Sequence, residues 1–506
     1  MFENLDARLL ARRLRDAGYS FESVADRLGD AAIDALARNT TPATRDALGA
    51  DTDAQADLIR LFMLHDALPA DRVARALGQP APWVDAGLLA AVAPGGATDL
   101  VAAVEIRPYA ATSDPGTPGA FDGWVAHDLL PTLDGRLDRP RPDYVLGLSP
   151  ASSTLAQMTI RRPVGSALDL GTGCGVQSLH LATHADRVVA TDLNPRAVSF
   201  ARLTGALNEL ILDVREGSLY EPVCDETFDL IVTNPPYVMS PPTGERLVYR
   251  EGGFTGDRLV EQVVRGGGAR LNPGGTLQVL GNWAMTDDAS WQDRLAGWIR
   301  PTGADALVLQ RERLDVYEYI EVWLHDAGLV GDPSYATRYR EWLDYFAAQG
   351  ITGVGMGWIM LHNAGRDQPD LTFEEWPHAV VQPVGVAFAA HQAGVADADI
   401  GDDDLLEATW VLHPGVDLET LGRPGEADPE HVVYRQRYGF GRAVEVDTAL
   451  GAVLGASDGE LDTATLITAV ADILDADAEA LADELLPRLR ELIRQGYLSR
   501  EGGPAT

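Results

Sequence analysis

The sequence contains no lysine, so its 40 basic residues are all arginines, and they stand against 76 acidic residues. The formal net charge of −36 opposes loose, charge-driven binding to nucleic acid, although it leaves room for a local basic groove. The lack of lysine beside abundant alanine, glycine, arginine and aspartate indicates a compositional bias of the genome more than a functional pressure.

Cysteine is scarce as well. The two cysteines, Cys174 and Cys224, form neither a metal-binding motif nor a disulfide framework, so we expect no metal. No apolar run approaches the roughly 20 residues needed to cross a bilayer, and residues 1–14 lack a signal-peptide pattern. These absences predict a reduced, cytoplasmic protein without a membrane partner.

The chain of 506 residues, 46% of them hydrophobic, is long enough for two to four domains, and its pattern predicts four ranges. Residues 1–95 carry apolar residues at helical spacing and predict a helical, winged-helix-like N-terminal domain. Within 96–330, strands and helices alternate from residue 164 onward, which predicts an α/β domain with a parallel sheet covered on both faces. We expect a β-rich accessory region over 331–440 and a C-terminal winged-helix-like module over 441–506.

Two details of this division matter for function. Segments 305–312 and 317–324 are close enough to predict a hairpin, which would place an antiparallel strand at one end of the sheet. The C-terminal module has no basic recognition helix, so a scaffold role is favoured over DNA binding.

A glycine-rich turn follows the first strand of the α/β domain, in the sequence DLGTGCGVQSL. Gly171, Gly173 and Gly175, with Thr172 among them, would let the backbone approach a ligand closely. The third glycine comes one residue too early for a dinucleotide fingerprint. Asp169 would repel a pyrophosphate and attract the ammonium of an amino-acid moiety instead.

The second strand ends at Asp192, about 20 residues after the glycine turn, where an acid suits the two hydroxyls of a ribose. A helix N-cap is the alternative interpretation of this residue alone. Ser218 and Leu219 would lie beside the base, although a plain turn explains them equally well. A nucleoside that carries a cationic amino acid and no phosphate matches this set, which predicts S-adenosylmethionine as the cofactor.

The next predicted strand runs into Asn234, Pro235, Pro236 and Tyr237. Asn-Pro alone indicates only a turn. Beyond the carboxyl end of a strand beside the cofactor, however, the Asn234 oxygen and a backbone carbonyl such as that of Pro235 can accept both hydrogens of a planar amino group. Rigid prolines and the ring of Tyr237 would complete a site that aims the nitrogen lone pair at a methyl group. We therefore predict these four residues to be catalytic, and Asn234 also to border the cofactor.

These motifs resemble those of class I S-adenosylmethionine-dependent methyltransferases of the Asn-Pro-Pro-Tyr type. Release-factor glutamine methyltransferases and small-domain methyltransferases of ribosomal RNA are the groups most similar, over roughly residues 145–325. The resemblance implies a Rossmann-like, seven-stranded methyltransferase sheet. It also implies that segment 146–156 closes over the substrate end of the cofactor, and that loop 249–259 is the Gly-Gly segment after the motif; a solvated loop is the alternative for 249–259.

The acceptor stays open between two chemistries. One is the side-chain amide of glutamine in a protein, and the other is an exocyclic amine of adenine or guanine in RNA or DNA. The acidic composition favours a protein partner. A non-catalytic scaffold that binds the cofactor is a further possibility, which the intact Asn-Pro-Pro-Tyr motif argues against.

Overall fold

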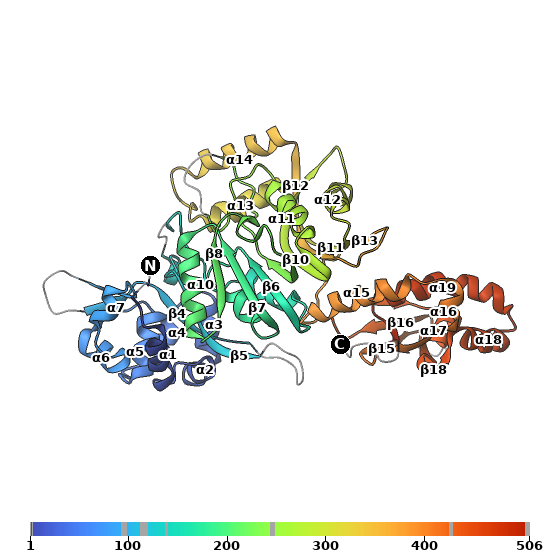
Figure 1. Cartoon of the computed structure of the whole chain (residues 1–506), viewed down its shortest axis with the longest axis horizontal. Coiled ribbons are helices and arrows are strands. Elements are labelled where there is room, and N and C mark those ends of the chain that lie inside the picture. The colour runs from blue at the N-terminus through green and yellow to red at the C-terminus, as the bar shows by residue number, and fades with distance from the viewer. Residues whose placement is uncertain are drawn as a thin grey trace. The chain divides into compact units, whose positions relative to one another are not determined.

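The computed structural model describes residues 2, 4–92, 99–111, 120–136, 140–242, 248–424 and 429–500. The chain divides into two compact units (Figure 1). The first comprises residues 1–156 and 161–376, and the second comprises residues 157–160 and 377–506. The finer division predicted at residues 95 and 440 stays a prediction.

An eight-stranded mixed sheet forms the centre of the first unit, in the order β13-β11-β12-β10-β9-β6-β7-β8. Its strands are β6 (Val164–Leu170), β7 (Ala185–Asp192), β8 (Leu212–Glu216), β9 (Phe228–Thr233), β10 (Leu271–Thr286), β11 (Asp305–Asp315), β12 (Ile351–His362) and β13 (Leu371–Glu375). All neighbouring pairs are parallel except those made by β12, which runs antiparallel to both β10 and β11. The predicted Rossmann-like α/β sheet is confirmed, with β13 added at the edge.

Helices cover both faces of this sheet because neighbouring strand residues point to opposite sides. Val189 packs into a core shared with α11 (Arg258–Gly268) and α12 (Trp291–Ile299). The next residue, Ala190, packs against α10 (Pro195–Leu207).

The predicted hairpin of 305–312 with 317–324 is wrong. Residues 317–324 belong to helix α13 (Val316–Asp326), which begins with a capping box made by Asp315 and Glu318. Helix α14 (Tyr335–Gln349) follows, and the strand that pairs antiparallel with β11 is β12. The predicted domain boundary at residue 330 is also wrong. Strands β12 and β13 lie beyond residue 330 and belong to the central sheet.

The N-terminal part of the first unit is helical, and its core is continuous with residues of α10 and of the helix that follows β6, Val176–Leu181. Its helices are α1 (Ala7–Asp16), α2 (Phe21–Leu28), α3 (Asp30–Ala37), α4 (Pro42–Leu48), α5 (Ala54–Phe62), α6 (Ala70–Leu77) and α7 (Ala81–Asp85). A small sheet has the order β1-β3-β2, from β1 (Leu68–Pro69), β2 (Leu89–Ala91) and β3 (Asp99–Ala102). A ribbon of β4 (Glu105–Ala111) and β5 (Phe121–His127) leads to α8 (Pro150–Met158), β6 and α9 (Val176–Leu181).

The second unit has its own core, built mainly from helix α17 onward. It holds two three-stranded sheets, β18-β14-β19 and β15-β16-β17. Its elements are α15 (Gly385–Ala398), α16 (Asp402–Glu407), β14 (Thr409–Leu412), β15 (Val416–Leu421), β16 (His431–Gln436), β17 (Ala443–Glu445), α17 (Thr448–Gly455), β18 (Asp458–Asp462), α18 (Thr463–Leu474), α19 (Ala478–Arg494) and β19 (Leu498–Arg500). The winged-helix interpretation of both ends of the chain stays a prediction, and residues 501–506 lie outside the described part.

Within the described ranges, none of the helices combines the length and the apolar character that a membrane span requires.

Candidate active site

The glycine turn lies directly after β6, where the strand gives way to helix α9. Gly171, Gly173 and Gly175 have φ angles of 76°, 56° and 84°. A Cβ added at Gly175 would lie 3.1 Å from the Cα of Ala201 in α10, so this glycine serves helix packing. A Cβ on Gly171 or Gly173 would meet nothing within 4 Å. The space beside these two glycines is therefore open on the side where a ligand would approach.

Asp169 lies under this turn and is 1% exposed. Thr172 Oγ1 and Ser178 Oγ donate hydrogen bonds to its Oδ2 atom at 2.6 and 2.7 Å. Burial raises the pKa of this carboxyl group to about 6, against the effect of the two hydroxyls. A cation beside Asp169 would offset the cost of holding a buried negative charge.

Asp192 lies at the end of β7 and is joined to the glycine turn. Its Oδ2 atom accepts a hydrogen bond from the Gly173 amide at 2.9 Å, and its Oδ1 atom accepts one from the Asn194 amide at 2.8 Å. Burial raises the pKa of Asp192, and the backbone amides that bond to it oppose this rise. The N-cap of α10 is Asn194, whose side chain accepts from the Arg196 amide, so Asp192 is not the helix cap.

The segment predicted to contact the base follows β8 at the same edge of the sheet. The Gly217 amide donates to the Asp192 carbonyl at 3.0 Å, which brings Ser218 and Leu219 next to the predicted ribose site. Both side chains are partly exposed. Leu219 has a positive φ of 46°, and it packs against the core beneath the sheet. Leu193, 59% exposed and adjacent to Asp192, is an apolar surface that the sequence reasoning missed.

The Asn-Pro-Pro-Tyr loop, residues 234–237, continues directly from β9. The Tyr237 amide donates to the Pro235 carbonyl at 2.7 Å, and the Gly252 amide donates to the Pro236 carbonyl at 3.0 Å. The ring of Tyr237 meets Trp323 of α13 edge to face, with centroids 6.4 Å apart. The predicted catalytic residues thus form one short loop, held on one side by segment 250–252 and on the other by α13.

The Oδ1 atom of Asn234 is buried and has no hydrogen-bond partner among the residues that the structure describes. A buried acceptor without a donor costs on the order of 1–3 kcal/mol. A ligand that donates an N–H at this place would supply the missing bond.

The loop after the motif is packed at Arg250, so a wholly solvated loop, the alternative for 249–259, is wrong. The Arg250 side chain is 7% exposed and bonds to Asp326 Oδ2 at 2.8 Å and to the Trp323 carbonyl at 3.0 Å. The Val238 amide donates to the Arg250 carbonyl at 2.8 Å. This loop therefore ties the Asn-Pro-Pro-Tyr segment to α13.

Segment 146–156, predicted to close over the cofactor, reaches the glycine turn through α9. The Gln177 side chain donates to the Ser152 carbonyl at 2.7 Å. Upstream, the Asn194 side chain donates to the Asp143 carbonyl at 3.0 Å, so the approach to this segment also borders Asp192.

Two arginines near the site, Arg250 and Arg196, are engaged in ion pairs. Arg250 contacts Glu251 at 3.1 Å in addition to Asp326. Arg196, at the start of α10, forms a two-pronged pair with the buried Asp128. Among the described residues, no group of three or more His, Cys, Asp or Glu side chains has an arrangement that could hold a metal ion.

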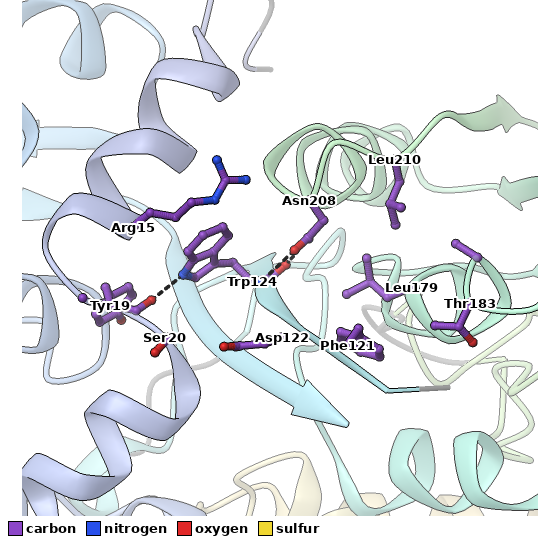
Figure 2. A pocket seen from close by; sticks show the side chains of 12 residues that line it. Arg15, Tyr19, Ser20, Phe121, Asp122, Trp124, Leu179, Thr183, Asn208 and Leu210 are labelled. Atoms are coloured by element: carbon purple, nitrogen blue, oxygen red, sulfur yellow. Dashed lines mark hydrogen bonds between the residues drawn. The ribbon is translucent and has the colours of Figure 1, made fainter. Parts of the chain in front are cut away.

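A cavity of about 400 Å³ lies elsewhere, lined by residues of α1 and the loop after it, of β5, and of α9 and the segment after α10 (Figure 2). The indole Nε1 of Trp124 donates to the Tyr19 carbonyl at 2.6 Å, and Asn208 Oδ1 accepts from the Trp124 amide at 3.0 Å. Arg15 pairs with Glu209 at 2.6 Å. Because Trp124, Asn208 and Arg15 already bond to protein partners, we interpret the cavity as a gap between packed elements.

Two buried residues beneath the Asn-Pro-Pro-Tyr loop escaped the sequence reasoning. Tyr319 of α13 and Asn282 of β10 are both fully buried, and their side chains bond to each other. Neither residue lies in a recognisable sequence motif. The polar Asn282 in the middle of an apolar strand was the feature that could have indicated a role.

Comparisons with known proteins point to methyltransferases. A family model described as methyltransferase small domain matches residues 147–293, and a domain of unknown function (DUF7059) matches residues 16–101. A release factor glutamine methyltransferase of Deinococcus radiodurans is 33% identical over 198 residues, which cover 36% of this chain and 68% of that protein. Ribosomal RNA small subunit methyltransferase C of Erwinia tasmaniensis is 27% identical over 177 residues, or 35% of this chain and 46% of that protein.

A solved 16S rRNA N2 G1207 methyltransferase of T. Thermophilus, in complex with AdoMet and guanosine, is 17% identical; the match covers 51% of this chain and 66% of that one. The TM-score of this match is 0.27. Apart from the Deinococcus enzyme, the chain spans about half the length of the curated relatives it matches. The relative of which the chain covers two thirds, together with the small-domain match, shows that the chain belongs to the class I S-adenosylmethionine-dependent methyltransferases.

Proposed function

We propose that the enzyme transfers a methyl group to the side-chain amide nitrogen of glutamine in a protein. The observation that carries this proposal is the buried Oδ1 atom of Asn234 in the Asn-Pro-Pro-Tyr loop, which has no hydrogen-bond partner within the described part of the chain. A primary amide has two N–H groups and a nitrogen lone pair that is delocalised into the carbonyl. It is a poor nucleophile unless its hydrogens are held by acceptors.

Two acceptors are available in the loop. Asn234 Oδ1 would take one amide hydrogen. The Pro235 carbonyl, which accepts from the Tyr237 amide, keeps a second lone pair for the other hydrogen. Holding both hydrogens draws the nitrogen out of conjugation and fixes the direction of its lone pair. The Tyr237 ring offers a flat surface for the planar amide.

The cofactor residues fit S-adenosylmethionine, which supplies an electrophilic methyl group when bound. The buried carboxylate of Asp169 would compensate the ammonium group, and Asp192 would accept from the ribose hydroxyls. The open space beside Gly171 and Gly173 would admit the ligand close to the backbone. Leu219, together with Ser218, would bound the base.

A protein acceptor is favoured over a nucleic acid by the charges near the loop. Contacts to phosphates come mainly from Arg and Lys. The chain has no lysine, and the guanidinium groups of Arg250 and Arg196 are bound to carboxylates. Recruiting either arginine to a phosphate would break an existing ion pair.

The test is to incubate the enzyme with S-adenosylmethionine carrying a tritiated methyl group and with an extract of cell protein and RNA. Label should survive nuclease treatment, be lost on proteolysis and be recovered as N-methylglutamine. Nuclease-sensitive label on an adenine or guanine amine would overturn the protein assignment and establish the nucleic-acid alternative. Asn234→Ala serves as the inactive control in both cases.

A further inference from the structure

Two residues beyond the catalytic loop, the chain turns into the protein interior at Met239. This residue is fully buried, so its amide N–H needs a partner within the protein. The loop has left β9, and the partner is the Tyr319 hydroxyl of α13, at 3.0 Å.

The same hydroxyl accepts a second hydrogen bond, from Asn282 Nδ2 at 2.9 Å. Asn282 lies on β10, the strand next to β9, and is fully buried. One phenolic oxygen therefore joins three parts of the molecule: the end of the catalytic loop, the central sheet and α13.

Packing fixes the position of this oxygen. The Tyr319 ring is fully buried and lies 6.0 Å from the Trp323 ring and 5.8 Å from the Phe346 ring. Burial also raises the pKa of Tyr319, so the hydroxyl stays neutral. Helix α13 also holds the loop at a second point. The Val238 amide donates to the Arg250 carbonyl, and the Arg250 side chain pairs with Asp326 of α13.

We propose that Tyr319 is a positioning residue for methyl transfer: its hydroxyl, supported by Asn282, holds the Met239 amide and so sets the position of the Asn-Pro-Pro-Tyr loop. This rests on the proposed function for its effect on turnover. Amide activation requires acceptors placed to within about 0.5 Å, so a small displacement of the loop lowers the rate without touching the cofactor site.

Tyr319→Phe tests the proposal, with Tyr317→Phe as the matched control. Tyr317 lies on the same helix, two residues away, and is 56% exposed. We expect Tyr319→Phe to speed hydrogen exchange at residues 238–240 and to lower the initial rate of label transfer to extract protein about tenfold, as for loss of about 1.4 kcal/mol. The Kd for S-adenosylmethionine should stay within about twofold, as for loss of a contact remote from the cofactor. Tyr317→Phe should match the wild type in all three measurements.

Equal exchange and turnover in the two variants would overturn the proposal, as would a loss of cofactor affinity as large as the loss of turnover. If Tyr319→Phe does not fold, Asn282→Leu removes the supporting amide and should change exchange and turnover in the same direction; unchanged values would count against the proposal. Hydrogen exchange can be measured without a substrate that accepts the methyl group. A wild-type enzyme that labels no protein therefore defeats the proposed function, while exchange at 238–240 still decides the role of Tyr319.

Discussion

The Oδ2 atom of Asp192 accepts a hydrogen bond from the Gly173 amide at 2.9 Å, which ties the end of β7 to the turn that follows β6. Two motifs that stand 19 residues apart in the sequence thus share one contact. The acid fixes the shape of the glycine turn and presents its remaining lone pairs at the same edge of the sheet. A substitution of Asp192 should therefore weaken cofactor binding in two ways: through the shape of the glycine turn and through the lost carboxylate oxygens.

We expect Asp192→Ala to weaken binding of S-adenosylmethionine by about 2–3 kcal/mol, the scale of hydrogen bonds to a charged group. Asn194→Ala is the matched comparison, since Asn194 is the helix cap. It should lower the free energy of unfolding by about 1 kcal/mol and leave affinity largely intact. Titration calorimetry and thermal melts of both variants check this pair, and full affinity in Asp192→Ala would remove the residue from the cofactor site.

Asn234→Ala should lower turnover by a factor on the order of 10² or more, because it removes an acceptor that acts on the reacting nitrogen. Cofactor affinity should change little. The variant also deletes a buried oxygen that none of the described residues hydrogen-bonds, so its melting temperature should stay equal or rise. Single-turnover kinetics beside a melt measure both effects. An active Asn234→Ala enzyme, or one that melts much earlier, contradicts the assignment.

Cofactor affinity should depend on pH through Asp169, whose pKa is about 6 in the free protein. Because the cofactor ammonium favours the ionised carboxylate, affinity should fall about tenfold per unit below pH 6 and level off above it. Binding near pH 6 should release protons, which calorimetry in buffers of different ionisation enthalpy detects.

Stability has the opposite trend. The folded-state pKa lies above the usual 3.8. The contribution of Asp169 to the free energy of unfolding is therefore fully present below pH 3.8 and is lost as the pH rises through about 6. Asp169→Asn should abolish both dependences. If the pH profile of binding persists in this variant, another group is responsible.

Gly173→Ala and Gly175→Ala should fail in different ways, although both positions have positive φ. Gly175→Ala drives a methyl group against α10, so overpacking should add about 1–3 kcal/mol to the loss of stability. Gly173→Ala has open space and should mainly weaken cofactor binding. Chemical denaturation and calorimetry separate the two effects; equal stability losses would contradict this division.

The sheet and the site motifs were predictable because each depends on local sequence. Strands such as 164–170 and 228–233 are short apolar runs, and each ends in a turn with its own chemistry. Helix 316–326 was missed since its aromatic and β-branched residues favour a strand, whereas the capping box at Asp315 and Glu318 and contacts with α14 favour a helix. The role of Tyr319 depends on a bond to Met239, 80 residues away, which no local pattern indicates.

The position of β12 between β10 and β11 has a consequence for the order in which the chain folds. During synthesis, β10 and β11 emerge first, and the strand that fills the gap between them arrives only after α13 and α14 have been made. Until residue 362 leaves the ribosome, the edges of β10 and β11 that pair with β12 have no partner and can pair wrongly with other strands. A recombinant fragment that ends at residue 330 would keep this state permanently, so a stable catalytic fragment must extend at least to Trp376, where the first compact unit ends.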